Sequence, residues 1–387
     1  MSVLSGRRVV HVTTTDMSLA LLLGPQLRAF AAAGMDVVGV SAPGPWVEQL
    51  EAGGIRHEAL RHATRSVAVG QDVLALGELT RLLRRLRPDI VHTHNPKPGL
   101  YGRVAARLAR VPVVVNTVHG LYATADDPAG RRALVYGLER FASVFSDAEL
   151  LQNVEDVDVL RRWRVPEGKV VVLGNGIDLS RFGPPDAAGV DKARAALGVG
   201  PDTVVVGFVG RLVWQKGLGE LLEAAEILRA RCPEVALVIV GPEDPDKADA
   251  LGQGDLARAR ALGNVALLGR RDDVEDLYPG FDVFVLPSYR EGFPRAAMEA
   301  AASGVAVVAT DIRGCRQVVD DGVTGLLVPV RDGGALARAL EELAGDAGRR
   351  RSMGAAGRRK AEAEFDDRRV VERTLAVYQR LLAGFRR

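Results

Sequence analysis

Cysteine, aromatic residues and long apolar runs are all scarce in this chain of 387 residues. The two cysteines, Cys232 and Cys315, have neither a CxxC spacing nor a histidine close by in the sequence. Isolated cysteines fit a reducing compartment, and a chain of this length can bury a core without disulfides. The six histidines show no spacing typical of metal ligands, so we expect no bound metal.

The sequence contains no apolar run approaching the roughly 20 residues that a membrane-spanning helix needs. Residues 1–10 pass through Arg7 and Arg8 into a short strand-like stretch, without the apolar core of a signal peptide. We therefore expect a cytoplasmic protein, which could still lie peripherally on the inner face of the cytoplasmic membrane.

A charge excess of either sign is also missing, because 51 basic and 49 acidic residues give a net charge of +2. A dedicated nucleic-acid-binding protein normally has a strongly basic domain, so we expect no nucleic-acid partner. Hydrophobic residues make up 47% and charged residues 26% of the chain, which excludes a disordered or fibrous protein.

The sequence does contain a regular alternation of short β-branched stretches and longer helical patterns. This alternation predicts βα units on parallel sheets. It is interrupted at residues 174–185, where three Gly and two Pro are typical of a linker. We predict an α/β protein of two doubly wound Rossmann-like domains, with ligands at the carboxyl ends of the strands. The expected division is 1–180, 181–365 and a basic amphipathic helix over 366–387.

The C-terminal segment combines an apolar helical face with a basic surround. Residues 349–387 hold 12 basic and 5 acidic residues, a net charge of +7. Helical spacing places one set of side chains on a single face: Val370, Val371, Thr374, Leu375, Tyr378, Leu381, Leu382 and Phe385. This helix could pack back on the first domain, or contact an anionic membrane surface, or do both with its arginines facing outward.

The strongest functional signal is the stretch PSYREGFPRAAMEAAASG, residues 287–304. Pro294 suits the first turn of a helix over residues 295–303. The start of such a helix offers free backbone N–H groups and a positive dipole end, which favour phosphate. Glu291 and Glu299 flank this start and can accept hydrogen bonds from hydroxyls. The pattern indicates a ligand with both phosphate and hydroxyl groups, such as a nucleotide sugar.

A second signal follows the first predicted strand of the second domain, where Arg211 and Lys216 lie between that strand and the next helix. Arginine binds phosphate oxygens bidentately and lysine acts as a point charge. Two fixed cations at a helix start can stabilise a diphosphate leaving group without a metal ion.

Together these motifs resemble the second domain of family-4 retaining glycosyltransferases, which have the GT-B architecture of two facing Rossmann-like domains. The resemblance depends on the two glutamates of EGFPRAAME, on the GRL and KG elements, and on DGVTGLLVP at residues 321–329. It implies a retaining, metal-independent hexosyl- or N-acetylhexosaminyltransferase. The donor would be a nucleotide diphosphate sugar, usually of uridine, with no other cofactor, and the two domains would close on it to exclude water.

The resemblance also implies a role for each matching residue. The donor-binding set is Arg211, Lys216, Arg270, Arg271, Gly292, Phe293, Pro294, Arg295 and Glu299. Arg211 and Lys216 would neutralise the diphosphate, and Glu299 would bind the ribose hydroxyls. Glu291 would bind the donor sugar. The expected catalytic residues are these two cations, Glu291 and His119, which would reach the transferred sugar from the first domain.

In the first domain, the resemblance is greatest to the bacterial capsule and cell-surface polysaccharide subgroup. It depends on HVTTTDMSL, HTHNPKPGLYGRVAARL and NTVHGLY, at residues 11–19, 92–108 and 116–122. Asn95 and Lys97 open a helix that could meet an acceptor phosphate, although Lys97 could equally be a solvated loop residue. His92 and His94 could be site residues or plain sheet residues. The loop at residues 13–18 lacks the Gly-Gly pair of many family members.

Several alternatives are weaker. An oxidoreductase needs GxGxxG directly after a strand, and no such match follows the first strand. Asp156 and Asp158 match the letters of a DxD metal motif but lie where a helix starts. A nucleotide-sugar epimerase or phosphorylase, or a non-catalytic relative, could share the fold. The acceptor is expected to be a polyprenyl-diphosphate-linked sugar, and the alternative is a soluble small molecule.

Overall fold

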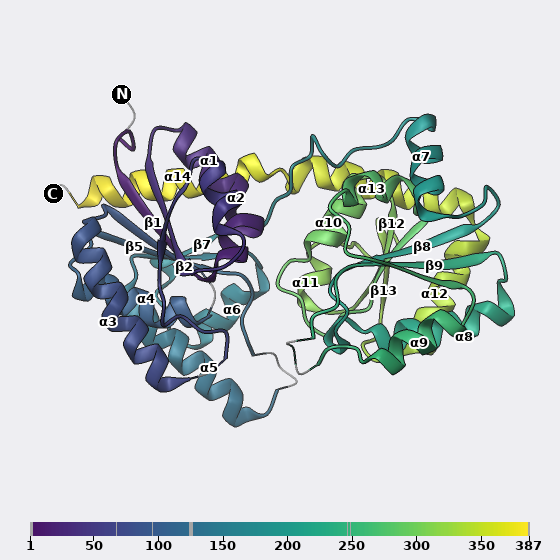
Figure 1. Ribbon diagram of the computed structural model, residues 1–387, viewed down its shortest axis with the longest axis horizontal. Coiled ribbons are helices and arrows are strands. Elements are labelled where there is room, and N and C mark those ends of the chain that lie inside the picture. Colours follow the sequence, from purple (N-terminus) through teal and green to yellow (C-terminus); the bar gives the residue numbers. More distant parts are fainter. Residues whose placement is uncertain are drawn as a thin grey trace. The chain divides into compact units, whose positions relative to one another are not determined.

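The chain folds into two compact units (Figure 1). The computed structural model describes residues 3–66, 68–94, 96–123, 127–245, 247 and 249–385. Unit 1 comprises residues 1–174 and 368–387, and unit 2 comprises residues 175–367. The chain therefore leaves unit 1 six residues before the expected division at 180, and its last segment belongs to unit 1 instead of standing apart.

Unit 1 is built on a seven-stranded sheet in the order β3-β2-β1-β4-β5-β6-β7, with every pair parallel. The strands are β1 (Arg8–Thr15), β2 (Asp36–Ala42), β3 (Arg56–Ala59), β4 (Ile90–His94), β5 (Val113–Val118), β6 (Ala148–Leu151) and β7 (Val170–Val172). Parallel strands need crossover connections, and helices supply most of them here.

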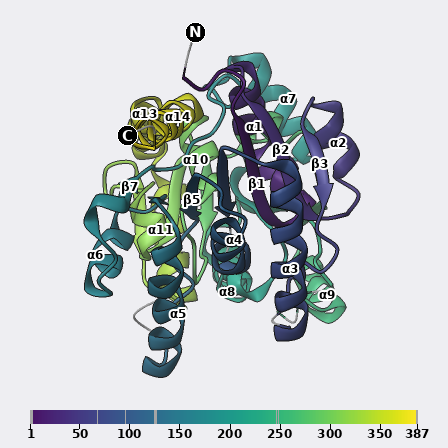
Figure 2. The same ribbon diagram turned by 90° about the vertical axis from the view of Figure 1, so that its left-hand side faces the viewer.

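The helices of unit 1 cover both faces of its sheet. They are the π-helix η1 (Ser18–Leu23), α1 (Gly24–Ala32), α2 (Val47–Ala52), α3 (Val69–Leu86), α4 (Pro96–Leu108), α5 (Ala129–Ala142), η2 (Ser143–Phe145), α6 (Glu155–Arg162), η3 (Glu167–Lys169) and α14 (Asp367–Gly384). Helices α3, α4 and α5 lie side by side (Figure 2). Alternate strand residues divide between two cores, one under α3 and α4 and the other under α1 and α14.

Unit 2 repeats this plan with six parallel strands in the order β10-β9-β8-β11-β12-β13. The strands are β8 (Val204–Val209), β9 (Val235–Val240), β10 (Val265–Gly269), β11 (Val283–Leu286), β12 (Ala306–Thr310) and β13 (Gly325–Val328). The helices are α7 (Ala187–Leu197), η4 (Trp214–Lys216), α8 (Leu218–Arg231), α9 (Gln253–Ala261), η5 (Val274–Asp276), η6 (Tyr278–Gly280), α10 (Arg295–Ala302), α11 (Arg313–Arg316), α12 (Gly333–Gly345) and α13 (Ala347–Glu364).

The predicted α/β class with two doubly wound domains is confirmed, and so is the return of the C-terminal helix to the first domain. The predicted apolar face of α14 packs into unit 1, because Thr374, Tyr378 and Leu382 are buried there. Phe385 is the exception, since it is largely exposed. Among the described residues, no helix is long and apolar enough to cross a membrane.

Candidate active site

In unit 2 the sheet order changes direction between β8 and β11, which are neighbours in space but not in sequence. In doubly wound sheets, ligands bind outside the carboxyl ends of the strands at such a switch point. Arg211 and Lys216 follow β8, and the loop with Glu291 follows β11. The topology thus brings the two strongest sequence motifs to one edge of the sheet.

Lys216 and Glu291 are in direct contact. The Lys216 Nζ donates to Oε1 of Glu291 over 2.5 Å, and the Ser288 hydroxyl donates to the same oxygen over 2.7 Å. The neighbouring Gly217 has φ +71°, and a Cβ there would lie 1.9 Å from the carbonyl oxygen of Pro287. Only glycine therefore lets the turn that carries Lys216 pack against the strand end that precedes Glu291.

Arg211 makes a separate ion pair in the same region. Its Nη1 donates to Oδ2 of Asp244 over 2.7 Å, and its side chain is 43% exposed. Asp244 follows β9, the strand beside β8. Arg211 is therefore held at the sheet edge by one carboxylate while much of its guanidinium faces solvent.

Glu299 lies on α10 and is mostly buried, with 15% of its side chain exposed. The Tyr278 hydroxyl donates to Oε2 of Glu299 over 2.9 Å, and the Arg295 Nε lies 3.9 Å from Oε1. Burial raises the pKa of the Glu299 carboxyl above its ordinary value, while the Arg295 charge and the Tyr278 hydrogen bond oppose this shift. Glu299 is thus a positioned carboxylate whose ionisation depends on its few polar neighbours.

Packing and a long-range hydrogen bond from Asn175 help to hold the loop that leads into α10. Pro294 is the N-cap residue, and the helix runs over Arg295–Ala302, close to the predicted 295–303. The Asn175 amide donates to the carbonyl oxygen of Phe293 over 3.2 Å, and the Phe293 ring meets Phe365 edge-on. Gly292 precedes them in the same loop and is partly buried.

Arg270 and Arg271 directly follow β10, and each pairs with a carboxylate two residues away. Arg270 donates to Asp272 over 2.9 and 3.1 Å, and Arg271 donates to both oxygens of Asp273 over 2.6 and 2.7 Å. Local pairing therefore orders these side chains, on a strand two places from β8 in the sheet.

Sequence reasoning missed several residues that hold the site. Tyr278 and Asp244 anchor two of the predicted residues. Tyr289, in the same loop as Glu291, donates to both carboxylate oxygens of Glu220 over 2.7 and 2.8 Å, and Arg331 stacks on its ring. Burial and the Glu220 contact raise the pKa of Tyr289 to about 12. Only the position of Tyr289 beside the EGF motif could have drawn attention to it.

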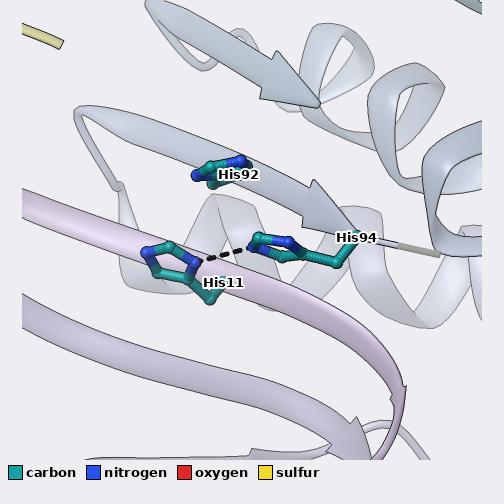
Figure 3. Close-up of side chains that lie close together, drawn as sticks. All are labelled: His11, His92 and His94. Carbon is teal, nitrogen blue, oxygen red and sulfur yellow. Dashed lines mark hydrogen bonds between the residues drawn. The ribbon is translucent and has the colours of Figure 1, made fainter. Parts of the chain in front are cut away.

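In unit 1 the switch point lies between β1 and β4, where three buried histidines meet (Figure 3). His11 and His92 are register partners on these strands, and His94 lies two residues further on the same face. Nδ1 of His11 lies 2.9 Å from Nε2 of His94, and Nδ1 of His94 lies 3.1 Å from Nε2 of His119. The predicted site residue His119 is thus the end of a hydrogen-bonded row of imidazoles.

Burial lowers the pKa of His119 to about 4, and a hydrogen bond with Gln152 opposes this shift. A neutral imidazole has one donor and one acceptor nitrogen, so a row of neutral rings can be hydrogen-bonded throughout. Nε2 of His11 is buried and has no hydrogen-bond partner among the described residues.

Burial also lowers the pKa of His11 to about 3, and it lowers the pKa values of His92 and His94 well below the ordinary value. The histidines in this row are therefore neutral near pH 7. His92 bonds the Tyr378 hydroxyl of α14 over 2.5 Å and the Thr117 hydroxyl over 2.6 Å. His92 therefore connects the C-terminal helix α14 to the sheet.

The histidine cluster has the proximity of a metal site, since one ring nitrogen from each of His11, His92 and His94 lies within 4.8 Å of the others. Tetrahedral zinc needs ligand nitrogens about 3.4 Å apart with lone pairs that converge. The rings of His92 and His94 instead stack at 4.2 Å with planes 26° apart, so their in-plane lone pairs do not converge. The geometry fits a hydrogen-bonded core.

A pocket of about 60 Å³ opens beside His119 at the carboxyl end of β5. Asn116, Tyr122 and Glu139 are among its lining residues. Behind Glu139 lies Arg103, fully buried, which donates to Glu139 over 2.7 Å and to Glu149 over 2.6 Å. Asn116 donates to Glu149 over 2.8 Å. The pocket wall is therefore polar and rigidly supported.

Lys97 has several partners within unit 1. Its Nζ donates to the carbonyl oxygens of Thr64 and Ser66 and to the Thr64 hydroxyl, over 2.7 to 2.9 Å. It also pairs with Asp72 over 2.6 Å. These contacts tie α4 to the loop before α3, and the binding of an acceptor phosphate by Lys97 stays a prediction. Asn95, its predicted companion, lies outside the described residues.

Comparisons with known proteins agree with this architecture. Residues 26–181 match the family described as Glycosyltransferase Family 4, and residues 203–346 match Glycosyl transferases group 1. The chain is 33% identical, over 73% of each sequence, to the UDP-Gal:alpha-D-GlcNAc-diphosphoundecaprenol alpha-1,3-galactosyltransferase of Escherichia coli. It is 28% identical to the capsular polysaccharide biosynthesis glycosyltransferase CapM of Staphylococcus aureus, over 98% of both chains. The structure of Anabaena HepE with UDP and glucose superposes with a TM-score of 0.81 at 20% identity, covering 96% of this chain and 99% of that one.

Proposed function

Because the chain belongs to the family-4 retaining glycosyltransferases and has their GT-B fold, we propose that it moves a hexose or N-acetylhexosamine from a UDP-sugar to a polyprenyl-diphosphate-linked sugar. The observation that carries the proposal is the Lys216–Glu291 pair at the switch point of unit 2. It places a cation and a hydroxyl-binding carboxylate where a diphosphate sugar would lie. The E. coli relative named above takes UDP-galactose and a diphosphoundecaprenol-linked acceptor.

On donor binding, the diphosphate takes the place of Glu291 as the partner of Lys216, and Arg211 binds a second phosphate oxygen. When the bond to the sugar breaks, negative charge develops on the leaving diphosphate. Two fixed cations stabilise that charge more strongly than the charge of the ground state, and this difference lowers the barrier. The backbone N–H groups from Gly292 to Arg295 add donors at the start of α10.

The two glutamates then orient the donor. Glu291, released from Lys216 but still bonded to Ser288, accepts hydrogen bonds from hydroxyls of the transferred sugar. Glu299 accepts them from the ribose, and Tyr278 fixes its carboxylate. Arg270 and Arg271 contact the base. Carboxylates that accept from two hydroxyls give orientation as well as affinity, so their removal should lower donor affinity and turnover together.

The pocket beside His119 is the proposed acceptor side. Glu139 and Asn116 supply a polar wall suited to sugar hydroxyls, and Arg103 holds that wall in place. His119 is neutral and its ring is committed to His94 and Gln152, so it acts here as a shaped wall and not as a proton acceptor. A lipid-linked acceptor would be reached at the inner face of the cytoplasmic membrane, where we place the enzyme.

The test is nucleotide release from a panel of UDP- and GDP-sugars, with and without a polyprenyl-diphosphate-sugar acceptor, with products identified by mass spectrometry. We expect release from a UDP-sugar only when the lipid-linked acceptor is present, with a product one hexose or N-acetylhexosamine heavier. Release that is independent of this acceptor would indicate a soluble acceptor instead. Absence of release from every donor would contradict the proposed activity.

A further inference from the structure

Helix α5 of unit 1 presents an apolar stripe to solvent. The side chains of Leu134, Leu138, Phe141 and Val144 are 64%, 42%, 53% and 58% exposed. The first three are spaced by four and three residues, which places them in one line along the helix, and Val144 continues it in η2. Tyr136, on the opposite face of α5, is buried. The helix is therefore apolar on the side that an ordinary surface helix keeps polar.

The charges around this stripe are mainly positive. Helix α5 carries Arg131, Arg132 and Arg140. Arg131 pairs with Asp127 over 3.5 Å, and Glu139, the one acidic residue of the helix, pairs with the buried Arg103. Unit 1 as a whole holds 27 basic and 18 acidic residues, a net charge of +9. Unit 2 holds 24 basic and 31 acidic residues, a net charge of −7. The small net charge of the whole chain is therefore the sum of a positive unit 1 and a negative unit 2.

We propose that the α5 stripe docks unit 1 onto the anionic lipid surface of a bilayer. Exposed leucine and phenylalanine side chains would enter the boundary between headgroups and acyl chains, and the arginines would lie against lipid phosphates. The net charge of −7 would keep unit 2 away from the same surface. The inference deepens the proposed function, since it would bring the acceptor pocket of unit 1 to a lipid-linked substrate.

Charge and apolarity argue against the two main rival partners for this stripe. A second copy would bring two units of net charge +9 together, and these repel each other. A nucleic acid would meet the arginines but would leave the aliphatic stripe in water. The basic helix α14, expected from the sequence as a membrane contact, has its apolar face inside unit 1 and can add only charge.

The experiment is co-sedimentation of the full chain with vesicles of phosphatidylglycerol and phosphatidylethanolamine, without any substrate. The test variant is the double substitution Leu134→Ser/Phe141→Ser. The matched control is Val323→Ser, since Val323 is 59% exposed but belongs to unit 2. We expect the double variant to need at least about tenfold more lipid for half-binding, because two partly buried apolar side chains are lost. Wild type and control should bind alike, and both should release as sodium chloride rises from 0.05 to 0.5 M.

Three results would overturn the inference: failure of the wild type to bind anionic vesicles at low salt, binding of the double variant like the wild type, or a dimer in sedimentation equilibrium that the double substitution dissolves. Because the substitutions are at exposed positions, thermal unfolding should confirm an intact fold. Transfer to a water-soluble short-chain acceptor should be unchanged in the double variant. Vesicle binding thus tests the surface alone, and the soluble transfer assay tests the proposed activity alone.

Discussion

The Lys216–Glu291 contact allows a prediction in which catalysis and stability separate. Lys216→Ala removes the cation, and Glu291→Gln keeps the shape of the side chain but removes its charge. The side chains are 22% and 12% exposed, so the pair is shielded but not sealed from water. In the Lys216→Ala variant, Glu291 still accepts its hydrogen bond from the Ser288 hydroxyl. Loss of the pair should therefore lower the free energy of unfolding by only about 1–2 kcal/mol, between the values for exposed and fully buried pairs.

The effect on turnover should be much larger. Removing one group that binds developing charge in a transition state costs about 10²–10³ in rate, or about 3–4 kcal/mol. We expect that loss for either substitution. In the double variant the loss should be smaller than the sum of the two, because both groups act on the same bound donor.

Initial rates of nucleotide release and urea unfolding on the same samples give both quantities. Arg258→Ala is the matched control in unit 2, because Arg258 pairs with Glu226 at the surface with 62% and 39% of their side chains exposed. It should change neither measurement by more than about 1 kcal/mol. The reasoning fails if Lys216→Ala retains more than about a fifth of wild-type turnover, or if its rate loss merely follows the unfolded fraction.

Three further predictions follow from buried groups. Since the pKa of Glu299 is raised, nucleotide affinity measured by calorimetry should fall with decreasing pH earlier than an ordinary glutamate would cause, and Glu299→Gln should remove that step. The histidines of the row should remain neutral down to about pH 5 in ¹⁵N spectra, since the pKa values of His11 and His119 lie at about 3 and 4; a ring that titrates near 6.5 would contradict this. As the pH falls, these histidines are protonated in the unfolded chain before they are protonated in the folded one. Their contribution to the free energy of unfolding is therefore complete above about pH 6.5. It is lost as the pH falls toward 4, at up to ~1.4 kcal/mol per pH unit for each histidine. Arg103→Leu leaves two shielded carboxylates without their cation, so it should lower the free energy of unfolding in urea by about 3–5 kcal/mol. Arg161→Leu, in an exposed pair with Glu167, should lower it by less than about 1 kcal/mol. Equal losses in the two variants would refute the distinction between buried and exposed pairs.

The alternation of β-branched and helical stretches was enough to predict two doubly wound domains. The reason is that a parallel strand must be followed by a crossover, and the period of the hydrophobic pattern changes from two to 3.6 at each one. The same logic placed the motifs of Lys216 and Glu291 at strand ends, where a parallel sheet gathers its functional loops. Sequence also located the start of α10 within a residue, because Pro294 marks it.

The contacts between segments far apart in the chain could not be predicted from the sequence. Lys216 meets Glu291 across 75 residues, and His92 meets Tyr378 across 286. No local pattern encodes such pairs, because they depend on strand order and on which face each helix covers. Lys97 is another example: its place at a helix start is visible in the sequence, but its hydrogen bonds to the loop before α3 are not.

What the sequence by itself determined is therefore the family, the two-domain α/β class and the residues that we propose bind a diphosphate sugar. All of these depend on residue types at short spacing. Only the tertiary structure decided which partner each of those side chains has, that three histidines far apart in the sequence form one row, and which apolar residues face solvent. The exposed apolar stripe on α5 and the charge difference between the two units follow from the fold, because burial and the charge of each unit depend on which residues lie together in space.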